Sequence, residues 1–150
     1  MNPEPIPATE LLPHGPEMTL IDRLVVSDAE RSVAVVEILP GSEFAESGGV
    51  PVWVGIEYMA QTIAARAGFE ARLNGEPPPI GFLVGTRKYT CSISVFPIGS
   101  RLEITAKPLF VESGFGAFDC TIASGGVVAS AILNTYRPTE AMLAEISGEK

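Results

Sequence analysis

His14 is the single histidine of the 150-residue chain, and it lies in a loop bounded by Pro13 and Pro16. Histidine titrates near neutral pH, so a well-placed imidazole can remove a proton from carbon. The two prolines stiffen the backbone, which lets the loop aim one side chain. His14 is therefore a candidate general base, and the alternative is an ordinary loop histidine.

Glu57 is the candidate general acid. Its neighbours at helical spacing are Trp53, Ala60 and Gln61, with Ala64 one turn further on, so it shares a mostly apolar helix face. A carboxylate on such a face is either buried or lines a crevice. Burial without a charge partner raises the pKa of a carboxyl group and favours the protonated acid, which can donate a proton near neutral pH. The alternative is that Glu57 reaches solvent or caps a neighbouring loop.

The two cysteines, Cys91 and Cys120, form no C-x-x-C pair, and His14 is far from both in sequence. A zinc site would therefore lack its usual set of ligands. We expect reduced thiols buried in the core, and no metal or organic cofactor.

The apolar and charged contents of the chain, 46% and 19%, are typical of one folded domain. No run approaches the roughly 20 apolar residues of a membrane helix. The first basic residue is Arg23, which argues against a positively charged leader. We expect a soluble, cytoplasmic protein, and the net charge of −8 disfavours nucleic acid as a partner.

One long helix is predicted over residues 51–74, with Pro51 in its first turn and Ile56, Ala60 and Ile63 at helical spacing. Asn74 and Gly75, followed by three prolines at 77–79, supply its end. Residues 32–39 are rich in β-branched side chains and predict a strand before this helix. Five prolines in the first 16 residues exclude a long regular element there.

The second half of the chain predicts strands over residues 81–89, 101–111, 116–123 and 127–136. Ser124-Gly125-Gly126 is typical of a hairpin turn, and Pro108 indicates a bulge or a sheet edge. The simplest arrangement is an α+β fold, in which a curved antiparallel sheet wraps around one long apolar helix. This is the hotdog arrangement, and its free sheet edges favour pairing with a second copy.

Two motifs resemble those of the 3-hydroxyacyl-acyl-carrier-protein dehydratases. Leu-Leu-Pro-His at 11–14, followed by Met-x-Leu-Ile-Asp-Arg at 18–23, is similar to the opening motif of that family. Gly-Ile-Glu-Tyr-Met-Ala-Gln at 55–61 is similar to its central-helix motif. The likeness continues through residue 136, so we expect residues 1–150 to form a single hotdog domain with its core at about 11–137, an irregular N-terminal segment and a short C-terminal tail. Trp-x-Gly-Ile-Glu at the helix start is most similar to the dehydratase-like subfamily of aryl-polyene clusters.

The resemblance implies dehydration of a 3-hydroxyacyl thioester, carried by acyl carrier protein or coenzyme A, to the trans-2-enoyl thioester. Matched by motif, His14 removes the α-proton, and Glu57 of the facing subunit protonates the departing hydroxyl. Val52 and Trp53 at the helix start are expected to bind the substrate, with N–H groups near the thioester carbonyl. Gln61 either lines the pocket or holds the helix. The resemblance also implies a homodimer or larger homo-oligomer, or a heterodimer with a paralogue.

The chain departs from that family in three places. Gly15 stands where the family has arginine, Val52 where it has glycine, and residues 44–51 replace a Phe-Pro-Gly-x-Pro run. These departures motivate a second hypothesis, a non-catalytic subunit that binds acyl chains or pairs with an active paralogue. A third hypothesis is a hotdog thioesterase in which Glu57 activates water, and His14 argues against it.

The negative charge of the chain also bears on the carrier, because acyl carrier proteins are typically acidic. Docking of such a carrier needs a local basic patch, and Arg87 and Lys88 are the only adjacent basic residues. Further candidates are Arg66 and Arg72 on the outer half of the helix, and Arg101 and Lys107 on one strand face.

Overall fold

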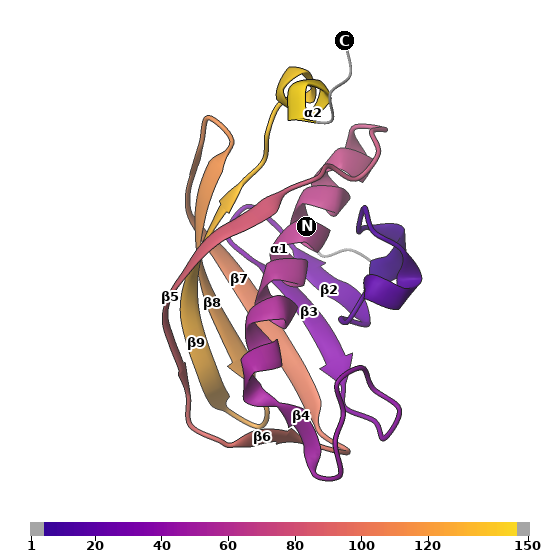
Figure 1. The fold of residues 1–150 in the computed structure, drawn as a ribbon, viewed down its shortest axis with the longest axis vertical. Helices are drawn as coiled ribbons and strands as arrows, with labels where there is room; N and C mark the ends of the chain where they lie inside the picture. The colour runs from indigo at the N-terminus through magenta and orange to yellow at the C-terminus, as the bar shows by residue number, and fades with distance from the viewer. Residues whose placement is uncertain (1–4, 147–150) are drawn as a thin grey trace.

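The computed structural model describes residues 5–146, and its main feature is a seven-stranded antiparallel sheet (Figure 1). Neighbouring strands follow the order β1-β2-β3-β7-β8-β9-β5, and β4 pairs with β6 in a separate two-stranded ribbon. The strands are β1 (Ile6–Pro7), β2 (Arg23–Ser27), β3 (Ser32–Glu37), β4 (Gly49–Pro51), β5 (Phe82–Cys91), β6 (Val95–Pro97), β7 (Arg101–Glu112), β8 (Phe115–Ala123) and β9 (Val127–Tyr136).

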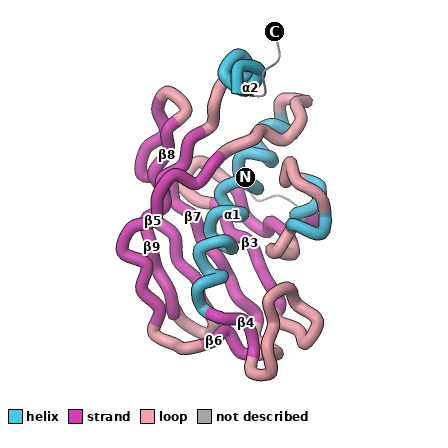
Figure 2. Tube along the Cα trace, in the orientation of Figure 1, coloured by secondary structure: helices cyan, strands magenta, loops and turns pink. Residues whose placement is uncertain are grey.

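The long helix α1 (Gly55–Leu73) lies against one face of this sheet, which curves around it (Figures 1 and 2). The core forms between them and includes Met59, Ile104 and Leu133, all fully buried. This is the hotdog fold that the sequence predicts.

The helix begins later than predicted. Pro51 is the last residue of β4, and the 3-10 turn η3 (Val52–Val54) precedes the first α-helical residue, Gly55. The reason is that Val50 pairs with Phe96 of β6, which holds Pro51 in an extended conformation with ψ of 142°.

The predicted strands all form, with small shifts at their ends. The predicted strand at 32–39 ends at Glu37, and the strand predicted at 116–123 begins at Phe115. The pairing register of β7 with β8 shifts between Pro108 and Phe110, which confirms the bulge. Gly125 and Gly126 both have positive φ in the predicted turn between β8 and β9.

Short elements at the two ends of the chain complete the fold. The 3-10 turns η1 (Ala8–Glu10) and η2 (Pro16–Met18) flank the loop that carries His14. The helix α2 (Glu140–Ile146) follows β9, where the sequence predicts only a tail. Residues 1–4, with Pro3 among them, and the tail at 147–150 lie outside the described residues.

The two cysteines differ in how deeply they are buried. Cys120 is fully buried, and burial raises the pKa of its thiol to about 12. Cys91 is only half-buried against the core, so the prediction of two buried thiols is wrong for Cys91. Among residues 5–146, no helix is long and apolar enough to cross a membrane.

The two edges of the main sheet differ in length. The strand β1 has two residues, whereas β5 has ten and pairs with β9 on one side only. Phe82, Leu83 and Val84 of β5 are all exposed. A long apolar edge of this kind offers unpaired backbone groups to another strand.

Candidate active site

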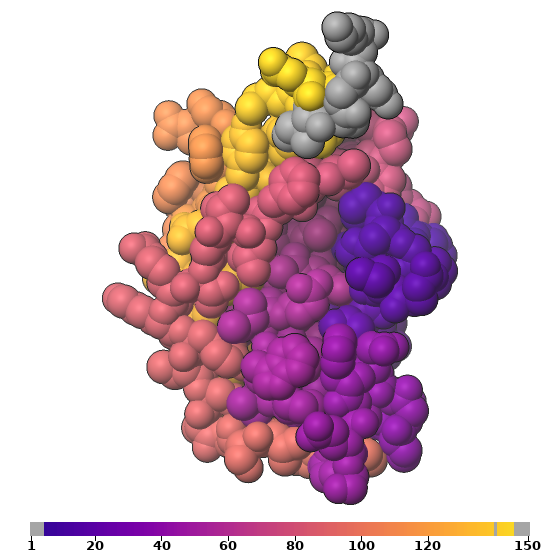
Figure 3. Space-filling model, in the orientation of Figure 1, coloured from indigo at the N-terminus to yellow at the C-terminus, as the bar shows by residue number. Residues whose placement is uncertain are grey.

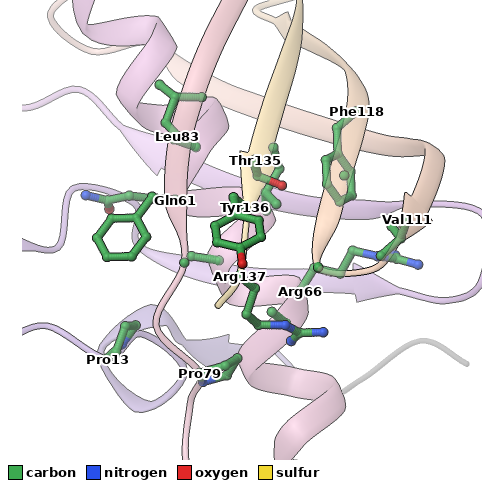
Figure 4. Close-up of a pocket in the computed structure, with 18 of the residues that line it drawn as sticks. Pro13, Gln61, Arg66, Pro79, Leu83, Val111, Phe118, Thr135, Tyr136 and Arg137 are labelled. Carbon is green, nitrogen blue, oxygen red and sulfur yellow. The ribbon is translucent and has the colours of Figure 1, made fainter. Parts of the chain in front are cut away.

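A groove of about 400 Å³ runs along α1, between the His14 loop on one side and the start of β5 on the other. In the space-filling view, the helix lies recessed between the indigo N-terminal segment and the pink β5 segment (Figure 3). Figure 4 shows how several elements far apart in sequence contribute to the wall, from Pro13 and Gln61 to Leu83, Phe118 and Tyr136. Both His14 and Glu57 line this groove.

His14 has a ring nitrogen with no hydrogen-bond partner. The residue is half-buried, and its Nε2 atom is the one buried side-chain nitrogen or oxygen between residues 5 and 146 that lacks a partner. A buried polar atom without a partner costs about 1–3 kcal/mol. Nε2 is not engaged by another group within residues 5–146, although the atom itself is buried in the single chain.

Glu57 lies one helical turn before Gln61, and the two side chains are bonded. Gln61 Nε2 donates to Glu57 Oε2 at 3.0 Å, which restrains the carboxylate. Glu57 is exposed to solvent in this single chain, so it lines a crevice rather than being buried. A second protein surface would be needed to exclude water from it.

Gln61 also connects the helix to the loop that follows His14. Its Nε2 donates to the Met18 carbonyl at 2.9 Å, and its Oε1 accepts from the backbone N–H groups of Leu20, at 2.8 Å, and Ile21, at 3.4 Å. With the bond to Glu57, these contacts use both donors and both acceptor positions of the amide. The side chain lines the groove, but its polar atoms are occupied by the protein, which favours the holding role over substrate binding.

The His14 loop is fixed on the helix at a second point, Gly68. A Cβ atom at Gly68 would overlap the carbonyl oxygen of Leu11 and lie 2.8 Å from its carbonyl carbon. Only glycine allows the backbone before His14 to approach the helix so closely. Gly68 and Gln61 together therefore set the position of the loop relative to α1.

Val52 and Trp53 do not lie among the residues that line the groove with His14 and Glu57. Trp53 is 60% exposed and meets the ring of Phe44 edge-on at 5.4 Å between centroids. The carbonyl of Val52 accepts a hydrogen bond from the Tyr89 hydroxyl, which ties the helix start to β5. Any contact of Val52 or Trp53 with substrate stays a prediction.

The far end of the groove contains residues that no sequence motif indicates. The Tyr136 ring packs on Phe115 at 4.5 Å, and its hydroxyl donates to Met142 Sδ at 3.0 Å. Phe118 and Thr135 lie nearby in the wall (Figure 4). They come from β8 and β9, and they reach the groove beside α1 only through folding.

Arg66 also lines the groove, but its side chain is occupied by the protein. It donates to the Asp28 carbonyl at 2.7 Å and to Ser32 Oγ at 2.9 Å, and it pairs with Glu70 at 3.4 Å. Over the described part of the chain, no three His, Cys, Asp or Glu side chains are arranged so that they could hold a metal ion.

Comparisons with known proteins agree with this geometry. The family model described as ApeP-like, ApeP dehydratase, matches residues 6–146. No curated protein matches the chain. Among solved structures, the dehydratase heterocomplex ApeI:P from Xenorhabdus doucetiae contains a chain with 28% sequence identity and a TM-score of 0.86, and the match covers 96% of this chain and 99% of that one.

More distant structures share the fold alone. A hypothetical thioesterase protein with coenzyme A from Streptococcus pneumoniae TIGR4 has 10% identity and a TM-score of 0.59, covering 77% of this chain and 84% of that one. Cj0977, a sigma28-regulated virulence protein from Campylobacter jejuni, has 17% identity and a TM-score of 0.58, covering 89% and 88%. The family match over nearly the whole chain shows that this hotdog protein belongs to the ApeP-like dehydratase family.

Proposed function

We propose that this protein dehydrates a 3-hydroxyacyl thioester to the trans-2-enoyl thioester, as one hotdog domain with His14 as base and Glu57 as acid. The observation that carries the proposal is that His14, whose Nε2 has no hydrogen-bond partner, lines the same groove as the restrained carboxyl group of Glu57. A base and an acid on one groove are the two groups that removal of a proton and a hydroxyl requires.

In the proposed reaction, His14 Nε2 takes the proton from the α-carbon, and the C–H electron pair forms the new double bond. The C–O bond at the β-carbon breaks, and protonated Glu57 donates its proton so that the hydroxyl leaves as water. The proton on His14 then returns to Glu57 through solvent. His14 and Glu57 account for every proton that moves, so the step is complete without a cofactor.

The walls of the groove support an acyl substrate. Ala60, Ile63 and Ala64 of α1, with Leu83 and Phe118 opposite, present an apolar lining. The volume of about 400 Å³ lies in the range of small-molecule sites. The thioester end would lie near His14, with the acyl chain along the helix.

A second subunit would complete the site. The exposed apolar edge of β5 supports strand pairing with another hotdog chain, and the X. doucetiae structure is itself a dehydratase heterocomplex. We infer that the partner is a paralogue of this chain or a second copy of it. By covering the groove, the partner would exclude water from Glu57 and favour its protonated form.

The carrier would be acyl carrier protein or coenzyme A. Two of the basic residues considered for docking are occupied: Arg66 is only 11% exposed and bonded, and Arg72 pairs with Glu10 at 3.1 Å. The prediction that Arg66 is an outer helix residue is therefore wrong. Arg87 and Lys88 of β5 are exposed and remain the adjacent pair that an acidic carrier could use.

The test is dehydration of a 3-hydroxyacyl pantetheine thioester, followed by absorbance of the conjugated enoyl product. His14→Ala and Glu57→Gln should each lower the rate by about 100-fold or more, because a general acid or base contributes 10²–10⁴. Glu70→Gln, on the same helix and groove, is the matched control and should keep most of the rate. A His14→Ala enzyme that is as fast as the wild type would contradict the assignment of His14 as the general base.

The arrangement of the pair can be tested separately. The family resemblance implies a pair across two subunits, although both residues also line the groove of one chain. We therefore expect part of the activity to return when His14→Ala and Glu57→Gln chains, neither active alone, are mixed under conditions of subunit exchange. Failure to recover activity despite proven exchange would show that each site takes its base and its acid from one chain.

The hypothesis of a non-catalytic subunit is favoured by one observation, the exposure of Glu57 in the single chain. It predicts that activity depends on a paralogue and survives His14→Ala in this chain. The assay with both subunits present distinguishes the two functions. A thioesterase would instead release free thiol and form no enoyl product.

A further inference from the structure

A second groove, of about 210 Å³, is lined by Thr19, Leu20 and other residues that the catalytic groove does not share. Its walls come from the η2 turn, the end of β3, residues 42 and 43, and α1. Four carboxylates line it: Glu17, Asp22, Glu37 and Glu43. We call it the acidic groove, and the proposed dehydration does not use it.

The hydroxyl of Tyr58 reaches into this groove. Tyr58 is only 2% exposed and belongs to the groove wall. Within residues 5–146, its hydroxyl makes no hydrogen bond to another group, and the oxygen stays open to the groove rather than sealed from it. The hydroxyl can donate one hydrogen bond and accept two, so it is available to a ligand with polar atoms at this point.

The charge in the groove shows which ligand fits. None of the four carboxylates belongs to an ion pair formed within residues 5–146, where the pairs are Arg66–Glu70 and Arg72–Glu10. Burial and the nearby charge of Glu37 raise the pKa of Asp22, although the Glu37 N–H bonded to its Oδ2 at 2.7 Å opposes this. A cation would relieve the repulsion between these two carboxylates.

The surface around the groove points to a protein rather than to a free cation. Met18, between two residues of the groove wall, is 61% exposed, and Leu39, just beyond Glu37, is 53% exposed. Phe44, next to Glu43, has a φ of 68° and contacts the exposed ring of Trp53. Exposed apolar side chains beside a charged centre are typical of protein interfaces.

We propose that the acidic groove binds an arginine side chain of a protein partner, and that apolar neighbours of this arginine pack on Met18 and the Phe44–Trp53 pair. A planar guanidinium group can donate to two carboxylates and to the Tyr58 oxygen at once, which a point-like ammonium does less well. The same negative charge repels an acidic carrier, so this face and the carrier face are different surfaces.

The probe is a blocked leucyl-arginyl-leucine tripeptide, titrated into the full ¹⁵N-labelled chain while amide NMR signals are followed. Millimolar affinity is expected, with shifts at the amides of Glu17, Glu37 and Glu43, because one buried charged contact with two apolar neighbours contributes only about 4 kcal/mol, equivalent to a Kd of about 1 mM. Leucyl-glutaminyl-leucine is the matched neutral peptide and should leave these signals in place. Spermidine and Ca²⁺ are titrated in the same way, to test whether the groove prefers a free cation to an arginine side chain of a protein.

Single substitutions test which side chains of the acidic groove contact the arginine peptide. Glu37→Gln should weaken arginine-peptide binding by about 5-fold, the effect of one exposed charge pair. Tyr58→Phe, which removes only the hydroxyl, should weaken it by about 3- to 10-fold. Glu103→Gln, an exposed carboxylate on β7, should not change it. Unchanged amide signals in the free variants confirm that they are folded.

Equal binding of the glutamine peptide, or equal affinity of the wild type and Tyr58→Phe, would overturn the proposal. Binding of spermidine or Ca²⁺ more tightly than the arginine peptide would show a free-cation site and would also overturn it. None of these outcomes depends on dehydratase activity, because Tyr58 and Glu37 do not line the catalytic groove.

Discussion

Gly68→Ala tests whether the backbone before His14 is set by its close approach to α1. The added Cβ would lie 2.8 Å from the Leu11 carbonyl carbon, and ordinary contacts begin at 3.4 Å, so the segment must move away by at least 0.6 Å. The overlap with the carbonyl oxygen demands more, and neither atom belongs to a flexible side chain. The substitution therefore shifts the His14 loop relative to Glu57.

Gly68→Ala is expected to lower the free energy of unfolding, whereas a change from glycine to alanine within a helix usually raises it. Glycine to alanine in a helix favours folding by about 1 kcal/mol. Overpacking against a backbone costs about 1–3 kcal/mol, and more where nothing can yield. We expect the free energy of unfolding to fall by about 1–2 kcal/mol, which lowers the melting temperature by about 2–8 °C for a chain of this size.

The effect on catalysis should exceed the effect on folding. A displacement of about 1 Å between reacting groups can lower a rate by about 100-fold. Urea unfolding followed by circular dichroism gives the stability, and the enoyl absorbance assay gives kcat below the unfolding transition. Gly41→Ala is the control, because a Cβ there meets nothing within 4 Å. If Gly68→Ala is as stable and active as Gly41→Ala, the close approach does not position His14.

Three further outcomes follow from named contacts. Gln61→Met keeps the length of the side chain but leaves the Leu20 N–H and Met18 carbonyl without partners, so urea unfolding should show a loss of about 2–4 kcal/mol, and kcat should fall. The pKa of Asp22 is raised above 3.8, chiefly by burial, so the carboxylate disfavours the folded state as pH rises through that pKa. Asp22→Asn should therefore gain stability relative to wild type from about pH 3 to pH 7. The gain should be small because Asp22 is only partly buried and keeps contact with solvent, and a difference independent of pH would contradict this. Reversing Arg87 and Lys88 to Glu should slow turnover of a substrate on acyl carrier protein but not of a pantetheine thioester, and equal losses on both would indicate damage to the fold.

Local sequence patterns predicted most of the elements, because they depend on interactions between near neighbours. The apolar spacing along 51–74 predicted α1, the alternation at 101–111 predicted β7, and Ser124-Gly125-Gly126 predicted the hairpin before β9. The end of a helix depends on contacts from elsewhere, and pairing of Val50 with Phe96 moved the helix start to Gly55. The last helix, α2, had no pattern strong enough to predict it.

Some residues of the candidate site were predicted from local sequence, and others could be found only in the tertiary structure. His14, Glu57 and Gln61 were found from residue type and spacing, since each motif lies within a few residues of sequence. Phe118, Thr135 and Tyr136 were missed, because they reach the groove only when β8 and β9 fold beside α1. The roles of Arg66 and Gln61 also needed the structure, since their partners, such as Asp28 and Leu20, are distant in sequence.

The sequence by itself determined the chemistry that this protein can offer: one imidazole, one helix carboxyl group and the elements that carry them. The tertiary structure alone decided that Nε2 of His14 is left without a partner, that Gln61 joins the His14 loop to Glu57, and that Tyr58 opens into an acidic groove. The physical reason is that the availability of a polar group depends on which distant atoms fill the space around it. Those atoms are fixed by packing across the whole sheet and helix.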